Sequence, residues 1–209
     1  MTPKRLTSKR LILEYESKRE MNLANFRISE FSEGKEGLRF QYSTPDQFID
    51  AYSDEELNLD YWWDGFNYSK DTLLKFIKTY SKQLSKREIE IAMAADIIDD
   101  DGYVVAIVTG DNITLKHELA HGYYFDTPLY RKTADEIISQ IPQEIIDKLK
   151  QNLLDINYTP EVLQDEIHAY LTAYDKCEWK ELFNNIKLKD VKKHIKLLDK
   201  NFKSFHPTL

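Results

Sequence analysis

Residues 115–122 carry the pattern with the clearest chemistry, because His117, Glu118 and His121 are spaced as HExxH. In a helix, histidines four residues apart project from one face about one turn apart, so both can bind one metal ion. Glu118 lies roughly 100° around that helix from His117, beside a bound metal. A carboxylate there is placed to act as general base toward a metal-activated water. The pattern therefore predicts a zinc site with hydrolytic chemistry.

A hydrolytic zinc site usually has three protein ligands, so a third donor must come from elsewhere in the chain. Glu166 is our candidate, since it lies among apolar residues on one half of the helix expected at 160–177. Burying a carboxylate is costly without a cation or hydrogen bonds, and zinc would supply the cation. An ion pair with Arg or Lys, or an outward-turned side chain, is the alternative. Asp165 and His168 fall on the polar half, and we expect them to face water.

Two supporting roles remain to be filled in such a site. Tyr124 shares the helical stripe of His117 and His121 and is the candidate donor to the oxyanion, with simple packing as the alternative. Metal-bound histidines usually donate a hydrogen bond from the other ring nitrogen. A backbone carbonyl, Asp126 or Asp165 is available to accept it.

The HExxH segment, followed 45 positions later by Glu166-Ile167-His168-Ala169, resembles the HExxH…ExxA arrangement of gluzincin metallopeptidases. The resemblance covers roughly residues 103–174. It implies that the two histidines and Glu166 bind Zn2+, and that Glu118 is the general base in peptide-bond hydrolysis. Tyr170 stands where many gluzincins carry an aspartate that orients a ligand histidine.

The elements expected around these residues define an α+β fold. Apolar runs and turn signals predict strands at 10–15, 26–31, 38–42 and 103–108. Helical spacing predicts helices at 45–52, 70–84, 86–98, 113–125, 133–140, 142–154, 160–177, 179–185 and 189–203. Ser69 is expected to cap the helix at 70–84, and Thr159 before Pro160 the helix at 160–177. We expect one zincin-like domain over 1–209, with a strand-containing lobe (1–110) and a helical lobe (111–209).

Composition limits the partners. A net charge of -7 and a pI of about 5.3 disfavour nucleic acid, because the overall field repels phosphate backbones. No apolar run is long enough to span a membrane. The basic N-terminus is not followed by the apolar segment that a signal peptide has, so we expect no signal peptide. Cys177 is the only cysteine and is expected to be a buried packing residue. The absence of a disulfide framework favours the cytoplasm. The lysine-rich segment 187–203 is expected to be the solvated face of an amphipathic helix.

These observations together predict a zinc-dependent metallopeptidase acting on a peptide or protein substrate. The strand at 103–108 is expected to pair with an extended peptide through its edge. One alternative is a zinc hydrolase of a non-peptide amide or ester. The other is a catalytically inactive, zinc-stabilised interaction protein, docking through the aromatic cluster 61–68 or the basic C-terminal helix.

Overall fold

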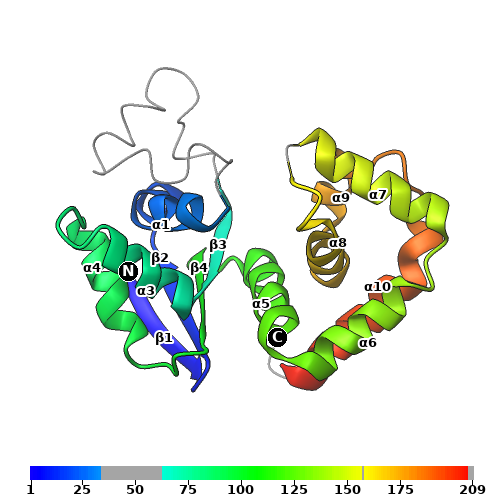
Figure 1. Ribbon diagram of the computed structural model, residues 1–209. Coiled ribbons are helices and arrows are strands. Elements are labelled where there is room, and N and C mark those ends of the chain that lie inside the picture. The colour runs from blue at the N-terminus through cyan, green and yellow to red at the C-terminus, as the bar shows by residue number, and fades with distance from the viewer. Residues whose placement is uncertain (34–62, 157, 207–209) are drawn as a thin grey trace. The chain divides into compact units, whose positions relative to one another are not determined.

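The computed structural model describes residues 1–33, 63–156 and 158–206 (Figure 1). The chain forms two compact units, Met1–Asp111 and Asn112–Leu209. The strand expected at 38–42 and the helix expected at 45–52 lie outside the described residues, as do residues 61 and 62 of the aromatic cluster. Among the helices that are described, none combines the length and apolar character needed to cross a membrane.

The first unit is built on a mixed sheet of four strands in the order β1-β2-β4-β3. The strands are β1 (Thr2–Thr7), β2 (Arg10–Tyr15), β3 (Gly65–Ser69) and β4 (Tyr103–Val108). β2 and β4 pair in parallel, whereas the β1–β2 and β3–β4 pairs are antiparallel. The helices of this unit are α1 (Lys18–Glu33), α3 (Lys70–Thr79) and α4 (Lys86–Ala95). They share one apolar core with the sheet, in which Leu11 and Val104 pack with Phe76 and Ile91.

Local sequence signals account for much of this unit. The bounds of β2 and β4 are those expected, and the Ser69 hydroxyl caps α3 by accepting a hydrogen bond from the backbone of Thr72. The prediction of a strand at 26–31 is wrong, because these residues belong to α1. The buried residues Met21, Ala24 and Ile28 follow helical spacing, which a window of six residues is too short to reveal.

β4 occupies the interior of the sheet. Its backbone pairs with β2 on one side and β3 on the other, so it offers no free edge. The expectation that this strand pairs with an extended peptide is therefore wrong. The aromatic segment contributed β3, which the sequence pattern did not predict, and there Phe66 and Tyr68 are buried in the core. β1 was also missed, because its side chains are largely exposed and give no apolar pattern.

The second unit is helical. It contains α5 (Asn112–Asp126), α6 (Pro128–Ile138), α7 (Gln143–Asp155), α8 (Leu163–Thr172), α9 (Lys176–Leu182) and α10 (Leu188–Phe205). α8 is the central element and contacts α5, α6, α7 and α10. Its Ile167 and Leu171 are fully buried in a core shared with Leu149 and Leu198. The fold class is thus α+β, as the sequence predicts.

Three expectations about the region of α8 are corrected. The helix expected at 160–177 is shorter and begins at Leu163, after a turn in which the Val162 amide bonds the Thr159 carbonyl. Thr159 is therefore too far upstream to cap it. Cys177, expected to be buried, lies in α9 and is exposed. The break between α8 and α9 turns it away from the core that a continuous helix would have given it.

Candidate metal centre

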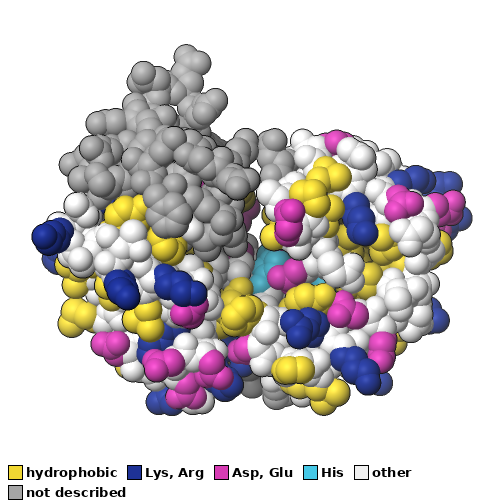
Figure 2. Space-filling model, in the orientation of Figure 1, with side chains coloured by type: hydrophobic (Ala, Val, Ile, Leu, Met, Phe, Trp, Pro, Cys, Tyr) yellow, Lys and Arg dark blue, Asp and Glu magenta, His cyan; other side chains and the backbone are white. Residues whose placement is uncertain are grey.

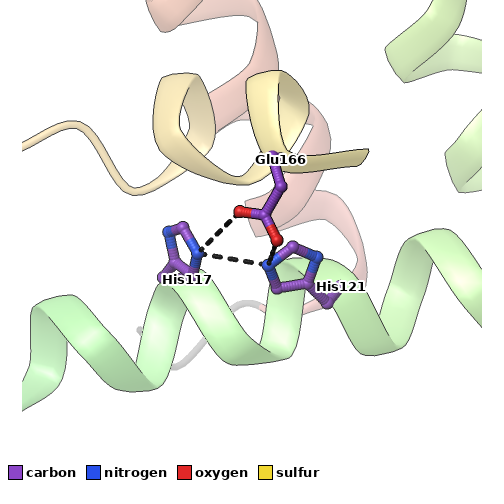
Figure 3. Close-up of side chains that lie close together, drawn as sticks. All are labelled: His117, His121 and Glu166. Atoms are coloured by element: carbon purple, nitrogen blue, oxygen red, sulfur yellow. Dashed lines mark hydrogen bonds and ion pairs between the residues drawn. The ribbon is translucent and has the colours of Figure 1, made fainter. Parts of the chain in front are cut away.

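Three potential metal ligands converge between α5 and α8 (Figure 3). His117 and His121 project from one face of α5, and their Nε2 atoms lie 3.1 Å apart. Glu166 reaches toward them from α8. Its Oε2 is 3.7 Å from His117 Nε2, and its Oε1 is 3.7 Å from His121 Nε2. The structure thus brings together the three residues that the sequence singled out as ligands.

Small buried side chains allow the two helices to pack closely. Ala120 on α5 and Ala169 on α8 are both fully buried. Ala120 lies one residue before His121, and Ala169 lies three residues after Glu166. α5 and α8 are in direct contact, and the small side chains at these two positions add little bulk near the cluster.

The spacing of these atoms suits a zinc ion. Donors about 2.0–2.1 Å from a tetrahedral zinc lie roughly 3.3–3.4 Å from one another, and here one ligand atom from each residue lies within 4.8 Å of the other two, with the two Nε2 atoms 3.1 Å apart. Glu166 Oε2 is also buried and has no hydrogen-bond donor among the described residues. A desolvated carboxylate oxygen is costly unless a donor or a cation faces it. Two imidazoles and one carboxylate with an orphaned oxygen therefore fit the donor set of a divalent metal ion, zinc among them.

Asp165 orients one of the histidines. Its Oδ2 lies 2.9 Å from Nδ1 of His121, which therefore donates to Asp165 and directs Nε2 toward Glu166. Burial lowers the pKa of His121, but the charges of Asp165 and Glu166 outweigh it and raise this pKa to about 10. Burial likewise opposes ionisation of Asp165, yet His121 lowers the pKa of that carboxyl below its ordinary value. Without metal, His121 is a cation held between two carboxylates.

The expectation that His168 faces water is wrong, whereas Asp165 remains 33% exposed but directs its carboxylate to His121. His168 is fully buried, and its Nε2 lies 2.7 Å from the hydroxyl of Tyr130. Burial lowers the pKa of His168 and favours the neutral ring. A helical wheel separates apolar from polar residues but assumes that a helix has one solvated side. α8 is surrounded by four helices, so much of its polar half is buried as well.

Tyr124 does not join the cluster. Its hydroxyl donates to Asp135 at 2.7 Å, and its ring stacks on His168 at a centroid distance of 4.9 Å. Two other tyrosines lie at the site. The ring of Tyr170 packs against the His117 imidazole at 4.7 Å, and its hydroxyl is 3.1 Å from that of Tyr158.

Tyr158 shares the electrostatic environment of the cluster. Burial raises its pKa above the ordinary value, and the charges of Glu166 and Glu118 raise it further. Its phenol therefore stays protonated and is a hydrogen-bond donor near both carboxylates. The sequence carried one signal for this pair, because Tyr170 lies one helical turn after Glu166. No local pattern pointed to Tyr158.

Glu118 is buried beside the three candidate ligands. Its side chain is 6% exposed, and its charge acts on the pKa of both His121 and Tyr158. The cluster itself is not sealed, since the side chains of His117 and Glu166 retain 15% and 13% exposure. Histidine atoms are visible at the surface beside an acidic side chain in Figure 2.

Comparison of the chain with protein family models, curated proteins and solved structures finds no match.

Proposed function

We propose that this protein is a zinc-dependent metallopeptidase in which His117, His121 and Glu166 hold Zn2+. The observation that carries the proposal is the convergence of these three donors from two helices at spacings suited to one ion. The resemblance to gluzincin metallopeptidases agrees with this ligand set. The remaining exposure of His117 and Glu166 leaves a side of the site open to water and substrate.

Glu118 is the general base in this proposal. A bound zinc ion would lower the pKa of a coordinated water toward about 7 and polarise the substrate carbonyl. Glu118 follows His117 in the sequence and lies roughly 100° around the helix from it, which places its carboxylate beside the proposed ion, where it would take the proton of the attacking water. The same carboxyl then returns the proton to the leaving amine nitrogen.

The Tyr158–Tyr170 pair is the better supported donor to the oxyanion. The Tyr158 phenol lies in the field of Glu118 and Glu166 and its raised pKa keeps it protonated. In its hydrogen bond with Tyr170 either hydroxyl can be the donor, so when Tyr170 donates, the Tyr158 proton is available to the oxyanion. The hydroxyl of Tyr124, our candidate from the sequence, is already donated to Asp135.

The proposed substrate is a peptide or protein, and the proposed location is the cytoplasm. Within the described part of the sheet, the unpaired edges belong to β1 and β3. Any addition of an extended peptide to the sheet would use one of these edges, since β4 is paired on both sides.

Metal analysis followed by activity screening tests the proposal. Protein purified without a histidine tag should contain one zinc ion per chain, and a peptide library should reveal cleavage that a chelator abolishes. Cleavage of only non-peptide amides or esters would assign the zinc hydrolase alternative. A full complement of zinc with no turnover of either panel would favour the zinc-stabilised interaction protein. Absence of bound metal after zinc loading and desalting would refute all three.

A further inference from the structure

Asp165 lies between two histidines. Its Oδ2 is 2.9 Å from Nδ1 of His121, and its Oδ1 is 3.5 Å from Nδ1 of His168. Oδ1 and the Nδ1 of His168 are both buried and have no hydrogen-bond partner among the described residues, and each is the polar atom that the other faces at 3.5 Å. Desolvated polar atoms without other partners gain most by pairing with each other. The two carboxylate oxygens therefore serve two different histidines.

His168 is itself held in place from its other side. The hydroxyl of Tyr130, a fully buried residue of α6, lies 2.7 Å from His168 Nε2. The carboxylate of Asp165 can only accept a hydrogen bond, so the proton of a neutral His168 ring belongs on Nδ1, and the Tyr130 phenol then donates to the unprotonated Nε2. Stacking of Tyr124 on the same ring at 4.9 Å limits rotation of His168.

We propose that His168 is a positioning residue of the metal site. It donates from Nδ1 to Asp165 and so holds that carboxylate against His121, which sets the affinity of the site for zinc. Asp165 needs this second anchor, because its side chain is 33% exposed and is free to turn toward water without it. The inference rests on the proposed function only in requiring that the site bind metal.

The test measures zinc affinity of the full chain by competition with a chelator. His168→Phe keeps a ring of similar shape but removes both ring nitrogens. We expect the affinity to fall on the order of 10-fold, the lower end of what outer partners of ligand histidines contribute. His168→Asn restores a donor near the position of Nδ1 and should recover most of the loss. His194→Phe is the matched control, since His194 is a buried histidine of α10 outside the cluster.

A purely structural role for His168 predicts a different result. His168→Phe would then lower thermal stability, as His194→Phe does, and leave zinc affinity unchanged. In an Asp165→Ala background, His168→Phe should cause no further loss of affinity, whereas an undiminished further loss contradicts action through Asp165. A parent protein that binds no zinc would overturn the proposed function as well. A parent that binds zinc as tightly as His168→Phe would overturn this inference alone.

A measurement on the parent protein decides the case if His168→Phe does not fold. Nitrogen-15 NMR of the histidine rings reports which nitrogen carries the proton. We expect the His168 ring to carry a proton on Nδ1. Protonation on Nε2 alone would leave no donor toward Asp165 and would overturn the inference.

Discussion

Nδ1 of His121 and Oδ2 of Asp165 lie 2.9 Å apart, which ties the buried histidine of α5 to the residue just before Glu166 on α8. One helix turn of α8 thus carries both a potential ligand and the carboxylate that orients another. Helical-face reasoning predicts that Asp165 faces water, which would make its replacement nearly neutral for metal binding. The contact instead makes Asp165 the acceptor for His121, one of the three acceptors that the sequence offered.

Asp165→Ala should weaken zinc binding by about 10- to 100-fold, because the His121 ring loses the acceptor that orients it. Glu166→Ala should weaken it more, since it removes a ligand. Chelator competition measures both affinities, with Asp135→Ala as a control for loss of a nearby carboxylate. Equal affinities of Asp165→Ala and the parent would show that the contact does not orient the ligand.

Glu118→Gln should separate metal binding from catalysis. The amide preserves size but cannot accept the proton of water, so turnover should fall on the order of 10² to 10⁴ while zinc content and folding persist. His121→Ala should lose the metal as well. Zinc stoichiometry, thermal melting and hydrolysis of a library-derived peptide are measured for each protein. Hydrolysis by Glu118→Gln at the parental rate would refute the metallopeptidase mechanism.

Tyr158→Phe should lower kcat by about 10² to 10³ with little change in zinc affinity, because it removes one donor to the oxyanion. Tyr124→Phe should change kcat far less, since that hydroxyl is donated to Asp135. Steady-state kinetics on one peptide compares the two variants. The reverse order of effects would restore Tyr124 as the donor.

The metal-free protein should lose stability as pH rises from neutral toward 10. Burial lowers the pKa of His121, but Asp165 and Glu166 raise it to about 10, above the ordinary value of about 6.5 for an unfolded chain. The stability contributed by the protonated ring is therefore fully present below pH of about 6.5 and is lost as pH rises through about 10. Thermal melting of metal-free protein against pH measures this loss.

The same protonation should make zinc affinity increase over that pH range, because the ring must release a proton to bind metal. His121→Gln supplies the control for the melting experiment, since it removes the titrating ring. An identical decline of stability in His121→Gln would assign the pH dependence to other groups.

Arg27 and Glu88 form a buried ion pair in the first unit, with Nε and Oε1 3.1 Å apart and side chains 6% and 3% exposed. Glu88→Gln should destabilise this unit by about 3–5 kcal/mol, because it leaves the Arg27 charge buried and unpaired. Adding Arg27→Met should recover part of the loss. Denaturant unfolding measures both, and a double variant less stable than Glu88→Gln would contradict the unpaired-charge explanation.

The sequence by itself determined the features that depend on neighbours along the chain. An apolar run delimits β4, a hydroxyl caps α3, and the i, i+4 spacing places His117 and His121 on one face of α5. The apolar surroundings of Glu166 also marked the side of α8 that faces α5. Each follows from helix or strand geometry, which is set by residues a few positions apart.

Tertiary structure decided what depends on neighbours distant in the chain. The four helices around α8 bury His168 and turn Asp165 toward His121, although both lie on the polar half of the helix. Tyr158, which lies between α7 and α8 in the sequence, comes near the charges of the cluster. β4 pairs with a strand on each side, so its backbone is not available to an extended peptide. Burial, hydrogen-bond partners and pKa values arise from groups that meet only in the folded chain, so periodicity along the sequence does not contain them.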